Sequence, residues 1–249
     1  MISIKTPEEL EIMAIAGRIT AGCLLKIEKA LRPGLKTREL DRIAYDYILS
    51  NHAKPAFKGY NGYPASICIS INEQVVHGIP GDREILDSDL VSVDVGVLKD
   101  NYFGDAARTF LMPEGDSEKK KLLDVTKKTL EKGVDAARAG NHLSDISFAI
   151  QDFAESYGYS VVRDLVGHGI GRKMHEEPQI PNYGKPGHGP ILKPGMTFAI
   201  EPMVNIGTWQ VVTLEDEWTI VTKDLKSSAH FENTIVVTDN ESRILTTVN

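Results

Sequence analysis

Five polar side chains interrupt apolar or glycine-bounded segments of this 249-residue chain: Asp94, Asp105, His168, Glu201 and Glu232. Burying an unpaired carboxylate inside a strand-like stretch costs several kcal/mol, so a positive partner is expected. No Arg or Lys recurs beside all five, and four negative charges match two divalent cations. An oxygen-rich set with one imidazole suits Mn, Fe, Co or Zn better than a structural zinc site, which usually takes thiolates. The five residues therefore predict a two-metal hydrolytic site.

Two of the acids lie in one expected hairpin. Asp94 and Asp105 flank the turn-forming cluster 99–101, so the stretch around them is typical of a β-hairpin in which the two aspartates face each other. Gly96 and Gly104 are expected to leave space for ions and neighbouring backbone. The alternative is a hairpin whose polar residues simply line its solvated face.

The histidine lies in a glycine-rich segment. His168 stands in 167–171, where three glycines in five residues predict close backbone approach or positive φ and no regular element. Their spacing does not match a dinucleotide-binding fingerprint. A lone histidine is more often a packed or surface residue, but His175, Glu176 and Glu177 nearby favour a functional site.

The remaining two acids come late in the chain. Glu201 interrupts the apolar stretch 197–204 and is expected to be buried. Glu232 alternates with His230 and Thr234, so the three are expected to share one face of a strand. Either acid alone could be an ordinary exposed residue, whereas five such interruptions in one chain favour a common site.

Composition and charge exclude several classes of protein. Hydrophobic residues make up 41% of the chain, enough for a large core. A net charge of −7, with basic runs only on an expected solvated helix face at 119–128, argues against a nucleic-acid partner. No apolar stretch reaches the ~18 residues that cross a bilayer, and no signal-peptide pattern is present, so a cytoplasmic protein without a membrane partner is expected. Cys23 and Cys68 lie far apart, which argues against a disulfide framework.

The expected elements recur in a fixed order. A capping box at Thr6 predicts a helix toward Leu31, and a second helix is expected with Thr37 as its cap. Strand-like runs follow at 66–71, 90–97 and 102–111. The order then restarts with a helix from near Ser117 to Gly140 and another from near Ser144 or Asp145.

A weak internal repeat accompanies this order. Five positions correspond at constant offset to five later ones: Arg32, Gly34, Leu40, Asp46 and Tyr47 to Arg138, Gly140, Ile146, Asp152 and Phe153. Two similar halves, roughly 1–112 and 113–249, are expected to form a single catalytic domain over 1–249. The expected class is α+β, with helices covering one face of a curved antiparallel sheet and the site at the join of the halves.

A set of ordered motifs resembles one family. The motifs are Tyr60-Asn61-Gly62-Tyr63-Pro64, Ile69-Ser70-Ile71-Asn72-Glu73, Val76-His77-Gly78-Ile79-Pro80, Val93-Asp94-Val95-Gly96, Gly104-Asp105-Ala106-Ala107-Arg108-Thr109, Gly167-His168-Gly169-Ile170-Gly171, His175-Glu176-Glu177-Pro178, Ile200-Glu201-Pro202 and Phe231-Glu232-Asn233-Thr234. Over nearly its whole length the chain resembles a type I methionine aminopeptidase of the short bacterial kind, in peptidase family M24. The resemblance implies the pseudo-twofold pita-bread (creatinase/aminopeptidase) fold. It also implies a dimetal hydrolase that removes N-terminal methionine from nascent proteins and peptides with a small second residue.

The resemblance assigns roles to the site residues. It makes Asp94, Asp105, His168, Glu201 and Glu232 the ligands of two divalent ions, with Co, Mn, Fe, Zn and Ni as candidates. A metal-bridged hydroxide would attack the scissile carbonyl, with Glu201 as proton shuttle. His175 would donate to the carbonyl oxygen as it becomes tetrahedral, and His77 would contact the peptide nitrogen.

The resemblance also assigns the pocket for the methionine side chain, lined by Tyr60, Tyr63, Cys68, Met174 and Trp218 beside His77 and His175. Ordinary core packing is the alternative for these apolar residues. Asn72 and Ser228 match positions that in relatives help to hold a monovalent cation, Na or K. The chain departs from common family residues at Met174, Phe57 and His230, which bears on pocket shape and metal tuning.

Other activities are known for the same fold. Another pita-bread peptidase, such as an Xaa-Pro aminopeptidase or prolidase, would use similar metals, but those enzymes usually carry an additional N-terminal domain. A non-catalytic binding protein or a metal-free creatinase-like hydrolase would be expected to lose a ligand, and all five are present. The expected partners are N-terminal methionyl peptides and nascent chains; a monomer is expected, and a transient ribosome contact is left open.

Overall fold

In the computed structural model, which describes residues 2–248, both helices of the first half form close to the expected bounds. Helix α1 (Pro7–Ala30) begins at the predicted capping box, in which Thr6 and Glu9 satisfy each other's backbone N–H groups. Helix α2 (Thr37–Ser50) follows. Thr37 is its first residue and not its cap as expected, because the Thr37 hydroxyl instead bonds the backbone of Gly81.

The helices of the second half repeat this arrangement. Helix α3 (Ser117–Ala136) ends before the expected Gly140, and α4 (Leu143–Ser156) begins slightly earlier than expected. Both bounds of α4 lie 106 residues after those of α2 (37 to 143 and 50 to 156). Gly34 (φ 80°) precedes α2 and Gly140 (φ 91°) precedes α4, and both adopt the left-handed conformation. The backbone N–H of each glycine donates to a carbonyl oxygen about 50 residues later in the chain, Ile85 and Leu192 respectively. The repeat seen in the sequence thus corresponds to repeated structure.

All strand pairings among the described residues are antiparallel. A four-stranded sheet joins β1 (Lys54–Pro55), β4 (Leu90–Lys99), β2 (Cys68–Ile71) and β5 (Tyr102–Leu111). A five-stranded sheet runs β15 (Arg243–Ile244), β14 (Asn233–Val236), β9 (Thr197–Ile200), β7 (Val166–Gly169) and β8 (Glu176–Pro181). Two three-stranded sheets contain β13 (Ser228–His230), β10 (Met203–Asn205) and β6 (Ser160–Val161), and β11 (Val211–Thr213), β12 (Ile220–Thr222) and β3 (Gln74–Val76). A short 3₁₀ turn, η1, spans Tyr60–Gly62.

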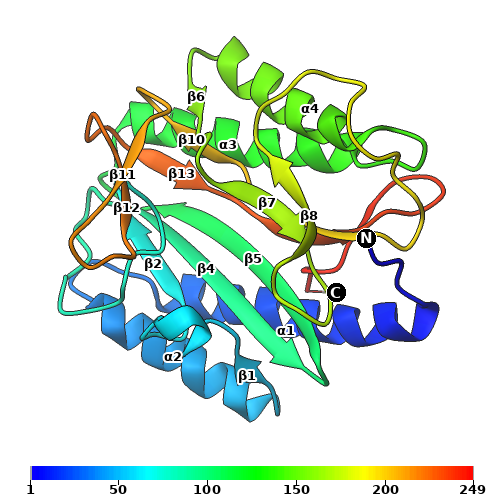
Figure 1. Cartoon of the computed structure of the whole chain (residues 1–249). Helices are drawn as coiled ribbons and strands as arrows, with labels where there is room; N and C mark the ends of the chain where they lie inside the picture. The colour runs from blue at the N-terminus through cyan, green and yellow to red at the C-terminus, as the bar shows by residue number, and fades with distance from the viewer. Residues whose placement is uncertain (1, 249) are drawn as a thin grey trace.

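The helices and sheets form two layers. Figure 1 shows α1 and α2 along one side of the molecule and α3 and α4 along the other, with the long β4–β5 hairpin between them. One apolar cluster, which includes Leu40 and Val93, joins α1 and α2 to the first sheet, and another, which includes Ile146 and Phe198, joins α3 and α4 to the second. The α+β pita-bread expectation is therefore confirmed. No helix within residues 2–248 is long and apolar enough to cross a membrane.

The hairpin differs from the expectation in its register. Asp94 pairs with Ala107 and Asp105 pairs with Gly96, so the two aspartates are diagonal neighbours on one face and do not oppose each other directly. The expectation that Gly96 leaves room for ions is wrong, because a Cβ there would lie 2.5 Å from the Phe57 ring. The backbone approach expected at Gly104 is present, against helix α1.

Two expectations about the late segments are also wrong. His168 does lie in a regular element, strand β7, although the expected close approach holds: a Cβ at Gly167 would lie 2.6 Å from the carbonyl oxygen of Ala199. Glu232 does not lie within a continuous strand, because β13 ends at His230 and β14 begins at Asn233. The interruption allows the Glu232 N–H to donate to the carbonyl oxygen of Ala107 on the β4–β5 hairpin.

Helix α1 depends on glycine to reach the hairpin. A Cβ at Gly104 would lie 2.8 Å from the backbone nitrogen of Gly17, and the Thr20 hydroxyl already donates to the Gly104 carbonyl oxygen. We predict that Gly104→Ala lowers the free energy of unfolding by about 1–3 kcal/mol, because the helix must move away from the sheet. Urea unfolding monitored by circular dichroism measures this change.

Gly81→Ala is the matched control. A Cβ at Gly81 meets no atom closer than 4.0 Å, and its φ is not positive, so its stability should change by less than about 0.5 kcal/mol. Equal stabilities of the two variants would contradict the close-packing role of Gly104.

Candidate metal centre and substrate pocket

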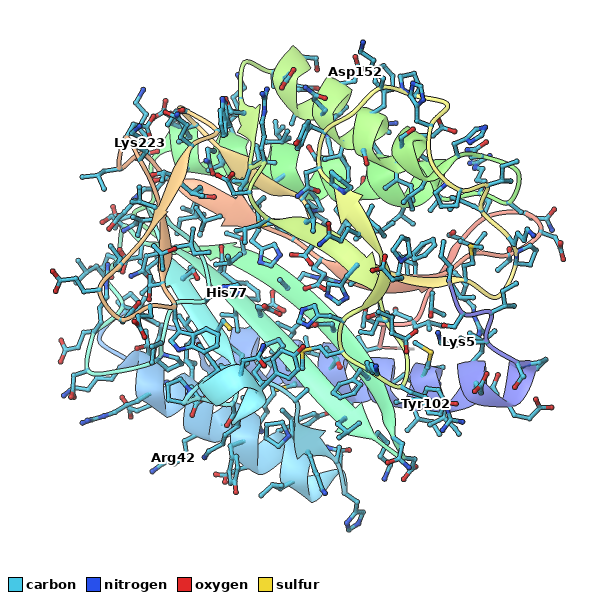
Figure 2. All side chains as sticks on the ribbon, viewed as in Figure 1. Lys5, Arg42, His77, Tyr102, Asp152 and Lys223 are labelled. Atoms are coloured by element: carbon cyan, nitrogen blue, oxygen red, sulfur yellow. The ribbon has the colours of Figure 1, made fainter. Side chains whose placement is uncertain are left out.

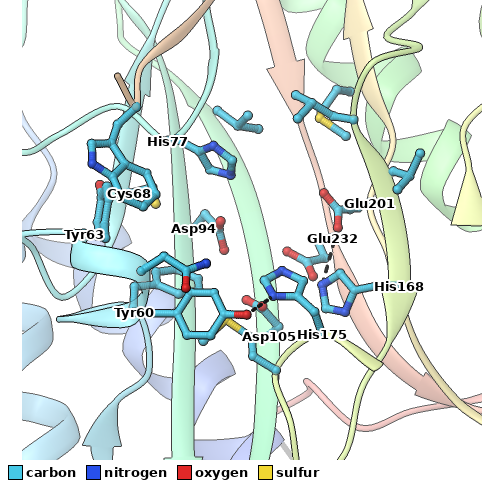
Figure 3. Close-up of a pocket in the computed structure, with 18 of the residues that line it drawn as sticks. Tyr60, Tyr63, Cys68, His77, Asp94, Asp105, His168, His175, Glu201 and Glu232 are labelled. Carbon is cyan, nitrogen blue, oxygen red and sulfur yellow. Dashed lines mark hydrogen bonds and ion pairs between the residues drawn. The ribbon is translucent and has the colours of Figure 1, made fainter. Parts of the chain in front are cut away.

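The five side chains singled out in the sequence meet at the join of the two halves. Asp94 and Asp105 come from β4 and β5, His168 from β7, Glu201 from the link after β9 and Glu232 from the link before β14. Figure 3 shows them converging on one space, with His77 and His175 beside them. Asp105, His168 and Glu232 each offer a ligand atom within 4.8 Å of the others, and His168 Nε2 lies 3.6 Å from Glu201 Oε1. The tertiary structure therefore assembles all five.

Without a positive partner, the surroundings of the four carboxyl groups disfavour the ionised form. Burial, together with the charges of the neighbouring acids, raises the pKa of Asp94, Glu201 and Glu232 well above the ordinary value. Burial also raises the pKa of Asp105 to about 7. Asp94 Oδ1, Asp105 Oδ1 and Glu232 Oε1 are buried without a hydrogen-bond partner within residues 2–248. Unpaired buried oxygens of this kind fit divalent cations, which supply the missing positive charge.

His168 is prepared to act as a neutral ligand. Its Nδ1 lies 2.8 Å from the carbonyl oxygen of Gly169, so Nδ1–H donates there and the Nε2 lone pair faces the acids. Burial, assisted by His175, lowers the pKa of His168 to about 4. At neutral pH the imidazole therefore offers a lone pair and adds no charge.

Several supporting residues were not assigned a role from the sequence. The Arg108 guanidinium donates to the carbonyl oxygen of Glu232 and to Asn233 Oδ1, and Asn182 Nδ2 donates to the carbonyl oxygen of Glu201. The Thr234 hydroxyl bridges the N–H and carbonyl oxygen of Asp105. These contacts hold the backbone of three acids. A cation such as Arg108 in an apolar strand carries the same signal that identified the acids, and Thr234 alternates with Glu232 in the sequence, whereas Asn182 carries no such signal.

Two further histidines line the same cavity of about 310 Å³. The Tyr60 hydroxyl lies 2.7 Å from His175 Nδ1, and the His175 ring centre is 4.3 Å from that of His168. His77 is held in the left-handed region with φ 60°, which is unusual for a residue with a side chain and typical of functional positions. Burial, together with His175, lowers the pKa of His77, so both rings are arranged as neutral hydrogen-bonding groups.

An apolar pocket opens beside the acids. Tyr63, Cys68 and Met174 form a buried cluster with Phe57, and Trp218 packs edge-on to Tyr63 at 5.0 Å between ring centres. The Tyr63 hydroxyl is turned away toward the carbonyl oxygens of Ile67 and Gly78. Aromatic faces and a thiol therefore line the space. Phe57, one of the departures, forms part of this wall by packing on Gly96.

His230, another position at which the chain departs from common family residues, lies next to Glu201. It is 2% exposed, and its Nε2 is 3.9 Å from Glu201 Oε2 with no hydrogen-bond partner in the described chain. Burial, with His77 and Arg108, lowers the pKa of His230 to about 3, so the ring is neutral.

Asn72 and Ser228 lie together but outside this cavity. The Ser228 N–H donates to the carbonyl oxygen of Asn72, whose φ of 56° turns the chain sharply. The Asn72 side chain joins Asp89 and the N–H of Leu90. The structure thus pairs these two residues and leaves the cation expected there as a prediction.

Comparisons with known proteins agree with this geometry. The family model of metallopeptidase family M24 matches residues 11–239. A methionine aminopeptidase of Clostridium acetobutylicum is 53% identical, over 99% of both chains. The crystal structure of a methionine aminopeptidase from Thermotoga maritima superposes with a TM-score of 0.97 at 47% identity, again over 99% of both chains.

A prolidase from Pyrococcus furiosus is more distant. Its TM-score is 0.80 at 25% identity, and the match covers 99% of this chain but 66% of that one. The methionine aminopeptidases therefore match this chain at higher sequence identity than the prolidase, and the match covers nearly the whole of their chains. The chain belongs to metallopeptidase family M24 and, within it, to the methionine aminopeptidases.

Proposed function

We propose that this protein removes the N-terminal methionine from peptides and nascent polypeptides whose second residue is small. The observation that carries the proposal is the junction of two environments in one cavity. Four acids and one neutral imidazole line one side of this cavity, and the apolar cluster of Phe57, Tyr63, Cys68 and Met174 lines the other. An unbranched thioether chain fits such a pocket, while its α-amine and carbonyl face the acids.

Asp94, Asp105, His168, Glu201 and Glu232 would hold two divalent cations. The unpaired oxygens of Asp94, Asp105 and Glu232 support this assignment. Such ions activate a water molecule at neutral pH and polarise the scissile carbonyl. Co, Mn, Fe, Zn and Ni all suit a carboxylate-rich set with one imidazole, and the choice among them depends on availability in the cell.

The chain's own residues move and hold the protons. Glu201 would accept a proton from the attacking water on its carboxylate and return it to the leaving amine. With the Tyr60 hydroxyl donating to His175 Nδ1, the imidazole carries its proton on Nε2, where it can donate to the carbonyl oxygen as negative charge develops. His77, whose ring lies 6.5 Å from that of Trp218, would contact the peptide nitrogen.

Three further assignments complete the proposal. All five ligands come from one chain, which supports a monomeric unit in which the two halves form a single catalytic domain. The Asn72 carbonyl oxygen beside Ser228 would help to hold one monovalent cation, Na or K. Nascent chains leaving the ribosome are the natural source of the substrate, because they begin with methionine.

The first prediction concerns substrate choice. Protein loaded with Mn or Co should release methionine from Met-Gly and Met-Ala peptides and spare Met-Lys peptides, as the proposed preference for a small second residue requires. Chromatography of the released amino acid, with metal content measured on the same sample, tests this. Preferential cleavage of Xaa-Pro peptides would instead assign the chain to prolidase-like chemistry.

The second prediction concerns proton transfer. Glu201→Gln keeps the size of the side chain but cannot accept a proton, so kcat should fall about 10²- to 10⁴-fold. Circular dichroism should show an unchanged fold. Glu131→Gln, an exposed change on α3, is the control and should retain full activity. Unchanged turnover in Glu201→Gln would exclude the proposed shuttle.

The third prediction concerns metal removal. When metal is chelated, the raised pKa values of the four acids mean that the folded state binds more protons than the unfolded state, whose acids titrate near pH 4. Stability should therefore fall as pH rises from about 4 through 7, by on the order of 2–4 kcal/mol. Urea unfolding in EDTA at pH 5 and pH 8 measures the loss, and added Mn should restore stability at pH 8.

A double variant serves as the control for this experiment. Asp94→Asn with Glu232→Gln removes two of the acids and should flatten the pH dependence of the chelated protein. Equal stability of the unmodified chelated protein at both pH values would show that the acids do not repel one another as proposed.

A further inference from the structure

The segment that carries His175 is fastened by residues from the far N-terminal end of the chain. Met174 and His175 lie in the link between β7 and β8, which contains no helix or strand of its own. Lys5 reaches this link, and it is 7% exposed, which is rare for a lysine. Figure 2 labels both Lys5 and Tyr102, the second of which lies on strand β5.

Glu176, the residue after His175, is the point of attachment. Its Oε2 accepts from the Lys5 ammonium at 2.8 Å and from the Ser3 hydroxyl at 2.8 Å. Its Oε1 accepts from the backbone N–H groups of Arg172 at 2.8 Å and Lys173 at 3.2 Å. One carboxylate therefore ties the N-terminal segment to both ends of the link.

The packing around this carboxylate leaves little room for alternatives. A Cβ at Gly171 would lie 2.6 Å from Lys5 Nζ and 2.7 Å from Glu176 Oε1. Lys5 is itself fixed, because its N–H donates to the carbonyl oxygen of Gly195 at 2.8 Å. The ammonium thus approaches Glu176 from a backbone position that is hydrogen-bonded to the segment before β9.

A second, more exposed contact holds the same link. The Arg172 guanidinium stacks over the Tyr102 ring at 4.8 Å and lies 3.3 Å from Glu9, which also accepts from the Tyr102 hydroxyl. The N–H of Phe103 donates to the carbonyl oxygen of Gly171. Arg172 is exposed, so this contact is weak compared with the buried Lys5–Glu176 pair.

We propose that Lys5 and Glu176 are positioning residues for His175: the N-terminal segment 3–5 sets where the imidazole stands over the acids. The proposal rests on the role of His175 given under the proposed function. Lys5 and Glu176 do not touch substrate. They act by holding the backbone on both sides of Met174 and His175, and misplacing such a group by about 1 Å can cost up to about 100-fold in rate.

The test compares Lys5→Met, Glu176→Gln and the double variant, each loaded with Mn. Methionine keeps the apolar stem of Lys5 and removes the charge. Because Lys5→Met removes the ammonium partner of a largely buried carboxylate and can lose stability, the double variant removes both charges and provides a protein that folds without that burden. Lys36→Met is the matched control. It breaks the more exposed Lys36–Asp82 ion pair at the start of α2 and should behave as the unmodified protein.

Two readouts are expected to change together. Amide hydrogen exchange at Arg172 and Lys173, followed by NMR, should accelerate about tenfold or more in Lys5→Met, because their acceptor is released. The value of kcat for a Met-Gly peptide should fall about five- to fiftyfold, while KM changes less than about threefold. The double variant should lose no more than the larger single loss, since the two residues act through one contact.

A His175→Ala background separates positioning from other effects. There, Lys5→Met should lower kcat by less than about twofold, because the group being positioned is absent. A lower melting temperature with unchanged kcat would show a purely structural role and overturn the proposal, as would an undiminished loss in the His175→Ala background. Full activity of His175→Ala alone would refute the catalytic role assigned to His175, and exchange at Arg172 and Lys173 would still report whether the N-terminal segment fastens the link.

Discussion

Mutual repulsion among four carboxyls gathered in one cavity is the interaction on which the rest of this structure depends. Asp94, Asp105, Glu201 and Glu232 are brought together in one cavity, where burial raises the pKa of all four and the charge of neighbouring acids raises it further for all but Asp105. Arg108 hydrogen-bonds the backbone beside Glu232 and so stabilises the position of one acid without neutralising the group. Divalent cations held by these acids would relieve the repulsion, and they would then contribute to the free energy of folding as well as to the chemistry.

The fold brings these acids together by repeating one unit. The helices α2 and α4 keep a constant offset, and the turns at Gly34 and Gly140 that precede them match. At the join of the halves, two acids from the β4–β5 hairpin meet two acids and the imidazole of the second half. Close approach at Gly104 brings helix α1 against the β4–β5 hairpin, and close approach at Gly167 brings strand β7 against β9 in the second sheet.

The acids and the residues of the apolar pocket are held by different kinds of backbone. The acids sit on or beside strands, and their backbone is fixed by Arg108, Asn182 and Thr234. Met174 and His175, which line the same cavity, are instead carried by a link without regular structure. Rigid elements hold preorganised charges well, whereas a link needs an external fastening, which the buried Lys5–Glu176 pair supplies under our proposal.

The sequence alone determined the helix order, the β4–β5 hairpin and the candidate site, because acids in apolar strands, the Thr6 capping box and the ordered motifs are local signals. It did not determine the diagonal relation of Asp94 and Asp105, the strand at His168, the interruption at Glu232, or the partners of Glu176. Register, strand ends and contacts across 171 residues depend on how distant segments pack, and a pattern of neighbouring residues carries no measure of that. Only the tertiary structure decided that Phe57 fills the space beside Gly96 and that the N-terminal segment reaches the link that carries His175. Both contacts follow from how segments distant in the sequence pack against one another.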